Sequence, residues 1–340
     1  LLYKVIGRSK KCATLKINTP AGREVFHELV KKSDVILHNY TPGAPIAAEV
    51  DYELLKSING GIILAALSGY GQDGPDGRRP GFDGTAQARC GGMVLTGFPG
   101  NDRIKTGIPF IDVTAGLFTT VGVLNALYHR EKTGEGQTID VSLYDTATFV
   151  SQSMGKLLLY HFYGEIRKQI GNRGFHSYNT CIEAIDGWVV LSIVTNSIWK
   201  RFTEKIGRPE MADDPRFGSD MDRFHNADAI NKVIGKWVAE HTVEELVKLC
   251  EEARVPCEPV QTIDQLLNDP QVKARDMVQQ IDFPGLGEIP IPGFPVKMSL
   301  TPGGIRSHAP GLGEHNDYVY KEILDLSNER IATLKEEGVI

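Results

Sequence analysis

One aspartate stands where its carboxylate could do chemistry. Asp112 lies in the segment TGIPFIDVTAG, residues 106–116, directly at the start of a long apolar stretch that is predicted to be a helix. Aspartate is a preferred N-cap and suits the positive end of the helix dipole, so local physics alone favours a capping role. The same position also suits a nucleophile, because an ionised carboxylate there lies beside amides that can stabilise developing negative charge. The two roles are compatible.

Other chemical motifs find little support. The glycine clusters at 69–74 and 81–84 fit neither a Walker loop nor a dinucleotide fingerprint, and no GxSxG elbow occurs. The nine histidines include no HExxH pattern or paired ligand spacing, so no metal site is predicted. Nucleotide hydrolysis and metal catalysis therefore lose support.

Composition places the chain among globular proteins. Its 340 residues, 41% hydrophobic and 24% charged, indicate two domains or one large domain with a satellite. The net charge of −6 disfavours nucleic acid as a partner, although Arg8, Lys10, Lys11 and Lys16 could meet a small phosphorylated ligand or form a solvated strand edge. Five cysteines without a CxxC pair indicate a reducing, cytoplasmic location. No apolar run approaches the roughly 20 residues that span a bilayer, so no membrane is expected.

The elements before Asp112 predict the frame of a site. Strands are expected at 12–18, 34–37 and 61–67, and helices at 20–31 and 52–56. This alternation predicts a parallel sheet with right-handed crossovers, whose ligands gather at the carboxyl ends of the strands. Those ends are the loops 39–41 and 68–71, and the second continues into a loop rich in glycine and proline. An ordinary surface loop would have the same composition.

The rest of the chain predicts a second domain. The helix at 112–129 is apolar nearly all round and is expected to be buried. Further along we expect a strand at 137–143, a long helix at 146–162, antiparallel strands at 178–184 and 187–193, helices over 198–268, an irregular stretch at 283–304 and a last helix at 317–325. The predicted fold class is α/β. It comprises a Rossmann-like large domain at 1–145, a linker helix at 146–171, a small α+β domain at 172–275, and a return segment at 276–340.

Short motifs along nearly the whole chain resemble those of the family III CoA transferases, also called the CaiB/BaiF family. This group includes formyl-CoA transferase, carnitine CoA-transferase and the alpha-methylacyl-CoA racemases. The motifs include NYTPG at 39–43, SGYGQDGP at 68–75, RPGFD at 79–83, GIPFID at 107–112, HREKTGEGQ at 129–137 and DDPRF at 213–217. Each is modest alone, but their order and spacing are specific.

The resemblance implies an activity for Asp112. In the family, the matching aspartate attacks an acyl-CoA thioester to give a mixed anhydride, which CoA then converts to an enzyme thioester. The substrates would be an acyl-CoA and a carboxylic acid, with no metal or redox cofactor. The resemblance also implies an interlocked homodimer.

The family's CoA contacts carry over to three segments of this sequence. They correspond to Leu15, Lys16, Ile17 and Asn18, to Asn39, Tyr40 and Thr41, and to Ser68, Gly69, Tyr70 and Gly71. The alternative is that these residues only close strands or fill the core.

Three departures from the family pattern shape the expectation. About 60 residues that precede Leu1 in the family, with its first strand, would be absent here, by ordinary βα unit sizes. A family arginine is replaced at Ala47. The glycine-rich loop that covers the aspartate in formyl-CoA transferase corresponds to residues 172–176 here, where Arg173, Gly174 and His176 form a bulkier, cationic substrate loop. Arg173 or His176 could then meet a second carboxylate or a hydroxyl of the acid.

Two other functions compete with the transferase. A racemase needs acid and base groups on both faces of the alpha carbon, and the related racemases place a histidine where this chain has Phe82. A phenyl ring cannot shuttle a proton. A CoA-binding protein without turnover is the other alternative.

Overall fold

The computed structural model describes residues 1–153 and 155–340, which form two compact units. The first unit comprises Leu1–Thr96, Arg103–Arg167 and Asp276–Ile340. The second comprises Gly97–Asp102 and Lys168–Arg275.

A parallel sheet organises the first unit. Its strands are β1 (Val35–His38), β2 (Ile63–Ser68) and β3 (Thr138–Ser142), in the order β1-β2-β3. Both neighbouring pairs run parallel, with Leu37 opposite Ala65 and Ala65 opposite Ile139. The predicted α/β class with a parallel sheet is confirmed.

Helix α2 (Pro20–Lys32), which precedes β1, and helix α3 (Tyr52–Ile58), which lies between β1 and β2, both begin after a capping side chain. Helix α2 starts after Thr19, whose hydroxyl accepts a hydrogen bond from the Gly22 amide at 3.1 Å. Helix α3 starts after Asp51, which accepts from the Leu54 amide at 3.1 Å. Each cap satisfies a backbone donor that the helix itself leaves free.

The predicted strand at 12–18 is wrong, because these residues are in irregular structure. Their backbone bonds reach scattered groups near the carboxyl terminus: the Lys16 amide donates to the Val339 carbonyl at 2.8 Å, and the Thr14 amide donates to Asn316 Oδ1 at 2.9 Å. A strand needs a neighbour that repeats such bonds in register. The alternating sequence pattern could not show that this neighbour is replaced by single contacts.

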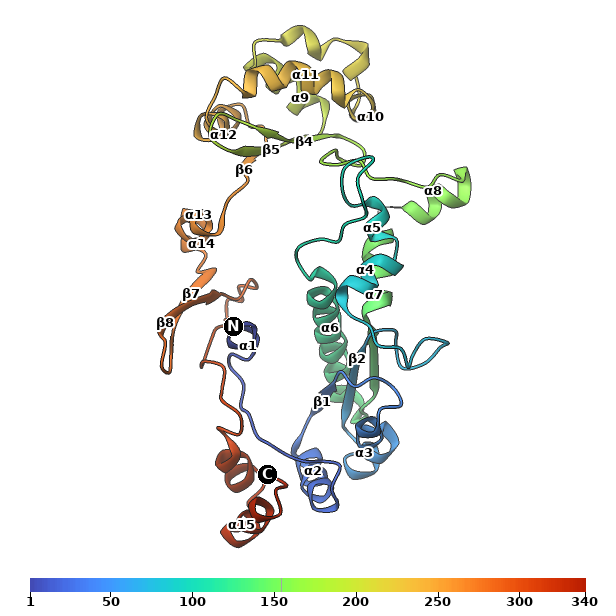
Figure 1. Cartoon of the computed structure of the whole chain (residues 1–340), viewed down its shortest axis with the longest axis vertical. Helices are drawn as coiled ribbons and strands as arrows, with labels where there is room; N and C mark the ends of the chain where they lie inside the picture. Colours follow the sequence, from blue (N-terminus) through green and yellow to red (C-terminus); the bar gives the residue numbers. More distant parts are fainter. Residues whose placement is uncertain (154) are drawn as a thin grey trace. The chain divides into compact units, whose positions relative to one another are not determined.

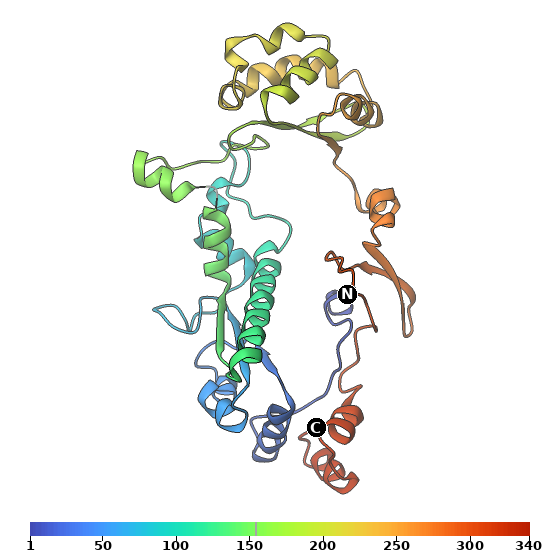
Figure 2. The same cartoon turned by 180° about the vertical axis from the view of Figure 1, so that it is seen from behind.

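Helix α6 (Phe110–Thr133) packs one side on β2 and β3, as Figures 1 and 2 both show. Ile111, Ala115 and Ala126 are buried on that side. On the other sides Leu117 and Leu124 are 62% and 61% exposed, so the prediction of a buried helix is wrong for most of its circumference. Apolar composition shows that a helix can be covered, but not which neighbours cover it.

Helix α6 is also long and apolar enough to cross a membrane, by length and composition only. This finding differs from the expectation that no apolar run approaches such a length, because the helix includes threonines and glycines among its apolar residues. A core helix of a soluble protein passes the same test.

The long helix predicted at 146–162 includes Met154, which lies outside the described residues. On either side of it are two separate helices, α7 (Leu143–Gln152) and α8 (Lys156–Tyr163). Gly155 precedes α8 with a left-handed φ of 73°, a conformation that glycine adopts without steric cost and that does not occur within an α-helix.

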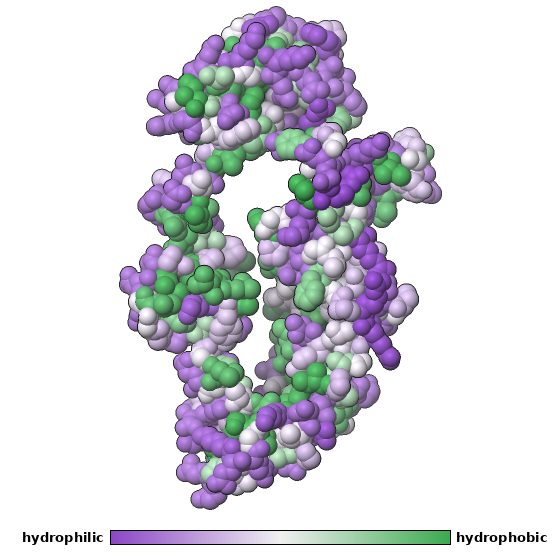
Figure 3. Space-filling model, viewed as in Figure 1, coloured by the Kyte–Doolittle hydropathy of each residue, from purple (hydrophilic) through white to green (hydrophobic). Residues whose placement is uncertain are grey.

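The carboxyl-terminal part contains more regular structure than predicted. Strands β7 (Val278–Phe283) and β8 (Gly287–Pro292) form an antiparallel hairpin where the sequence predicts an irregular stretch from residue 283. Prolines, which favoured that interpretation, are tolerated in β8 because it is an edge strand of a two-stranded sheet. Around the hairpin, Figure 3 shows apolar surface, to which Leu286 and Phe294 contribute.

The predicted last helix is a short π-helical segment, η4 (Tyr318–Ile323), and a further helix, α15 (Asn328–Glu336), follows it. Tyr320 and Leu334 pack with Val25 of α2 in one apolar cluster. The remaining elements of this unit are α1 (Leu2–Ile6), η1 (Pro45–Val50), α4 (Asp83–Arg89) and α5 (Gly92–Leu95).

The second unit is built on an antiparallel sheet. Strands β4 (Tyr178–Glu183) and β5 (Trp188–Ile193) form the predicted hairpin, and the short β6 (Cys257–Pro259) joins β5. The remaining elements are helices: α9 (Asn196–Lys205), η2 (Pro209–Ala212), η3 (Pro215–Phe217), α10 (Asp220–His225), α11 (Ala227–Val238), α12 (Val243–Glu252), α13 (Ile263–Asn268) and α14 (Pro270–Ala274). Apolar residues from β4, β5, β6, α9, α11 and α12 form a single core, and the surface of this unit visible in Figure 3 is mostly hydrophilic.

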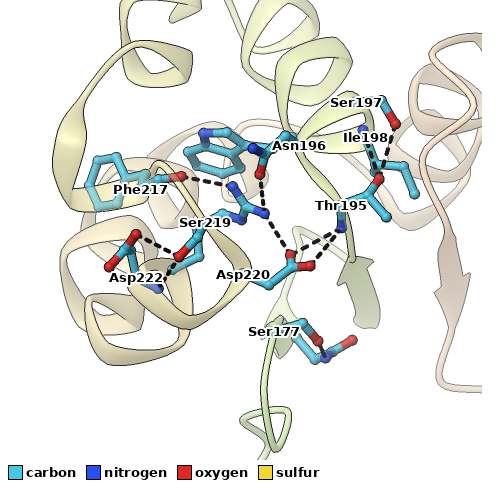
Figure 4. A network of polar contacts seen from close by, with 12 residues as sticks. Ser177, Thr195, Asn196, Ser197, Ile198, Phe217, Ser219, Asp220 and Asp222 are labelled. Carbon is cyan, nitrogen blue, oxygen red and sulfur yellow. Dashed lines mark hydrogen bonds and ion pairs between the residues drawn. The ribbon is translucent and has the colours of Figure 1, made fainter.

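The second unit also contains a buried arginine, Arg223 of α10. Arg223 has no exposed side-chain surface, and its guanidinium donates to the Phe217 carbonyl at 2.7 Å, Asn196 Oδ1 at 2.9 Å and Asp220 Oδ1 at 2.6 Å. Asp220 also accepts from the Thr195 amide at 3.0 Å, and Thr195 has a positive φ of 79° (Figure 4). The network ties the start of α9 to α10 and η3.

Candidate active site

Asp112 is not the N-cap of α6. The helix begins at Phe110 with Pro109 at the cap position, and Asp112 lies in its first turn. The cap interactions come from Asp83 at the start of α4, whose Oδ2 accepts from the amides of Ile111 at 2.9 Å and Asp112 at 3.3 Å. The capping interpretation of Asp112 is therefore wrong, because another carboxylate already holds the amides that it would bind.

The Asp112 carboxylate itself is uncommitted, in the sense that no described side chain or amide binds it. Among the described residues it makes no hydrogen bond or ion pair, and it lies exposed at the edge of a pocket. Partial burial, and secondly the charge of Asp83, raise the pKa of Asp112 above its usual range. A carboxylate with a raised pKa is a stronger base and a better nucleophile in its ionised form.

The pocket has a volume of about 410 Å³ and lies at the carboxyl ends of β1 and β2. It brings Asp112 together with four of the predicted CoA-binding residues, Asn39, Thr41, Ser68 and Gly69. The other lining residues are Leu67, Pro80, Gly81, Phe82 and Leu143.

The other predicted CoA contacts lie outside this lining. Tyr40 stacks on His38 with ring centroids 5.3 Å apart, and buried Gly71 donates its amide to Ser68 Oγ at 2.9 Å. Tyr70 faces the guanidinium of Arg89, 5.0 Å from its ring centroid. Leu15, Lys16, Ile17 and Asn18 belong to the irregular segment that contacts the carboxyl terminus.

Two glycines allow the pocket to form. The backbones of Gly69 and Gly81 cross so closely that a Cβ on Gly69 would lie 2.7 Å from the Gly81 Cα, and one on Gly81 would lie 2.8 Å from the Gly69 Cα. Because backbone atoms cannot swing aside as a side chain can, neither position accepts a larger residue without moving a loop of the pocket.

We expect Gly81→Ala to destabilise the first unit by about 1–3 kcal/mol, as overpacking does elsewhere, and to weaken CoA binding. Urea unfolding and titration with CoA would measure both effects. Gly84→Ala is the matched control, since its Cβ would meet only Lys105 Cδ at an ordinary 3.6 Å. Equal behaviour of the two variants would contradict this account of the crossing.

The predicted substrate loop belongs to the second unit. Arg173 forms an ion pair with Asp228, and His176 is exposed. Gly174 is required sterically, because a Cβ there would lie 2.7 Å from the Ser177 carbonyl oxygen.

Sequence reasoning missed Asp83 and Gln87 as site residues. Asp83 ends the RPGFD motif, but its role depends on a contact with the amide of Ile111, which lies 28 residues later in the sequence. Both side chains are buried, and such buried polar groups are rarely without partners. The signal that the sequence does offer is an aspartate flanked closely by two glycines, Gly81 and Gly84. In the described part of the chain no three His, Cys, Asp or Glu side chains are grouped to hold a metal ion.

The fold defines a mixed α/β protein with a parallel sheet that carries a carboxylate pocket at its carboxyl edge. The family model of CoA-transferase family III matches residues 1–316, and the chain belongs to this family. It is accordingly an enzyme of the CoA-transferase type.

Relatives and solved structures agree with this assignment. The chain is 31% identical to the succinyl-CoA–D-citramalate CoA-transferase of Chloroflexus aurantiacus, over 100% of this chain and 85% of the relative. It is 35% identical to the beta subunit of the succinyl-CoA–L-malate CoA-transferase of the same organism, over 98% and 83%. A crystal structure of a CaiB/BaiF family protein from Brucella suis superposes with a TM-score of 0.80 at 29% identity, covering 94% of this chain and 83% of that one. The predicted family resemblance is confirmed.

Proposed function

We propose that this enzyme moves CoA from an acyl-CoA donor to a carboxylic acid through covalent intermediates on Asp112. The observation that carries the proposal is the uncommitted carboxylate of Asp112, which lies in a pocket with the loops that follow β1 and β2. Nucleophilic catalysis needs a group of this kind, exposed to the substrate and not neutralised by its own protein.

The first half of the proposed reaction loads the enzyme. An Asp112 oxygen attacks the thioester carbonyl of the donor, the carbon–sulfur bond breaks, and CoA leaves as thiolate. The thiolate then attacks the Asp112 carbonyl of the resulting anhydride. The donor acid departs with one of the original Asp112 oxygens, and Asp112 carries CoA as a thioester.

The second half reverses these steps with the acceptor. Its carboxylate attacks the Asp112 thioester and releases CoA thiolate, which then attacks the acceptor carbonyl of the new anhydride. The products are the new acyl-CoA and a free Asp112 that has kept one acceptor oxygen. No electrons are transferred, so the proposed cycle needs no metal or redox cofactor. It does need water to be kept from both intermediates.

We also propose that CoA binds along residues 15–18, 39–41 and 68–71, which correspond to the CoA contacts of the family. We further propose that the enzyme works as an interlocked homodimer in the cytoplasm. Exposed apolar side chains on α6 and α8, among them Leu117, Leu124 and Leu157, support association with a second copy.

For the acids, we propose a dicarboxylic donor such as succinyl-CoA and a hydroxylated or plain dicarboxylic acceptor, as in the names of the two relatives. A second carboxylate on the acceptor needs a cation. Arg173 is the candidate, since its guanidinium already pairs with a carboxylate, that of exposed Asp228.

We expect Arg173→Ala to lower kcat/KM for dicarboxylic acceptors about 10- to 100-fold while leaving monocarboxylic acceptors nearly unchanged, because one charge-assisted contact is lost. Steady-state rates with paired acceptors would measure the change. Arg216→Ala, which removes another exposed arginine of the same unit, should alter neither class. An unchanged preference in Arg173→Ala would refute the role of Arg173.

The function as a whole is tested by incubating the protein with succinyl-CoA and a panel of acids in deuterated water. New acyl-CoA products without deuterium at the alpha carbon support the transferase. Deuterium at that carbon without CoA exchange would instead support a racemase. A racemase is disfavoured because Phe82, which lines the pocket, stands where the related racemases have a histidine, and a phenyl ring cannot shuttle a proton. Binding of CoA without either reaction would leave only a CoA-binding protein.

A further inference from the structure

Two buried polar side chains stand behind the start of α6 and take no direct part in the proposed chemistry. Asp83 and Gln87 lie one turn apart on α4 and are 9% and 3% exposed. Gln87 Nε2 donates to Asp83 Oδ1 at 2.5 Å, and Gln87 Oε1 accepts from the Thr106 amide at 3.0 Å. The pair therefore connects α4 both to the first turn of α6 and to the segment that leads into it.

The remaining oxygen of Asp83 is directed at α6. Its Oδ2 accepts from the amides of Ile111 and Asp112, at 2.9 and 3.3 Å. These amides form the positive end of the helix, which would otherwise stabilise a carboxylate in its first turn. By taking them, Asp83 denies that stabilisation to Asp112 and places a second negative charge nearby.

The charge of Asp83 acts differently on the ionised and the covalent forms of Asp112. Ionised Asp112 is repelled by Asp83, whereas Asp112 in an anhydride or a thioester carries no charge and feels no such repulsion. Acylation of Asp112 therefore relieves an unfavourable interaction of the resting enzyme.

We propose that Asp83, held by Gln87, is a positioning residue that keeps the Asp112 carboxylate unpaired and biases it toward its covalent forms. This inference rests on the proposed function of Asp112. Asp83 of α4 is the charged group that acts on Asp112. Lys105, in the segment before α6, lies near Gly84 of α4.

The test compares Asp83→Asn with wild type by two readouts. The first is the titration of the Asp112 carboxyl followed by carbon-13 NMR, assigned by its loss in Asp112→Asn, which needs no turnover. The second is the fraction of enzyme carrying CoA on Asp112 at steady state, by mass spectrometry. Asp83→Asn removes the repelling charge, so we expect the Asp112 titration and the acid limb of kcat to move to lower pH. We expect the covalent fraction to fall about 10-fold or more.

Three further variants make the result decisive. Asp83→Glu keeps the charge and should restore much of the wild-type behaviour. Glu28→Gln removes one charge from an exposed side chain of α2 and should change neither readout. Gln87→Leu leaves Asp83 Oδ1 without its donor and should also lower the covalent fraction, which keeps the test open if Asp83→Asn does not fold.

A folded Asp83→Asn protein with an unmoved Asp112 titration would overturn the inference, even if its activity fell, because the role would then be structural only. Wild-type covalent loading in Gln87→Leu would overturn it as well. If wild type itself forms no adduct at Asp112, the proposed function fails instead, while the NMR titration still decides whether Asp83 acts on Asp112.

Discussion

Asp112→Asn is expected to lower CoA transfer by at least about 1,000-fold, because it removes the nucleophile that both halves of the cycle use. The amide is nearly isosteric with the carboxylate but cannot attack a thioester. Transfer from succinyl-CoA to the best acceptor, followed by chromatography of the acyl-CoA products, would measure the loss.

The variant should fold normally. Burial and the charge of Asp83 both disfavour the ionised form of Asp112, so a neutral side chain removes an unfavourable interaction and breaks no hydrogen bond of the carboxylate. We therefore expect an unchanged or slightly higher Tm and unchanged CoA binding. Asp112→Ala should be equally inactive, which excludes activity regained by deamidation of the asparagine. Residual transfer within about 10-fold of wild type would contradict covalent catalysis at this residue.

Asp220→Ala is expected to destabilise the second unit by about 3–5 kcal/mol, because it leaves the buried charge of Arg223 without its anion. Arg223 has no exposed side-chain surface and would keep only its two neutral acceptors, Phe217 and Asn196. The Thr195 amide would also lose its acceptor.

The chain offers a selective measurement of this effect. Its three tryptophans, Trp188, Trp199 and Trp237, all lie in the second unit, so fluorescence during urea unfolding reports on that unit. Asp228→Ala is the control, since this aspartate also pairs with an arginine but is 75% exposed, and such pairs contribute at most about 1 kcal/mol. Adding Arg223→Met to Asp220→Ala should recover stability by removing the stranded charge. A loss below about 1 kcal/mol in Asp220→Ala would refute the structural role of the pair.

Much of the frame could be predicted because its signals are local. Thr19 and Asp51 cap helices within three residues of themselves, and the alternation of strands and helices defines a parallel sheet. Because β1 and β2 are parallel neighbours, their carboxyl ends lie at the same edge of the sheet. Asn39 and Ser68, which stand at these ends, line one pocket.

What failed depends on contacts between distant segments. The role of Asp112 was ambiguous because its local sequence is that of a cap, and only the fold shows that Asp83 supplies the cap. The segment around Lys16 alternates like a strand but finds single partners near Val339. Pattern and propensity describe what a segment can do, whereas these outcomes depend on the neighbour it meets.

The most direct test of covalent transfer follows the acceptor oxygens. The proposed cycle leaves one acceptor oxygen on Asp112 at each turnover, so an acceptor labelled with oxygen-18 in its carboxylates should label the peptide that contains Asp112. Mass spectrometry of that peptide after many turnovers should show incorporation of the isotope at Asp112, and none in Asp112→Asn. Rapid CoA transfer without any label at Asp112 would contradict the account, because CoA would then pass between the acids without a covalent enzyme intermediate.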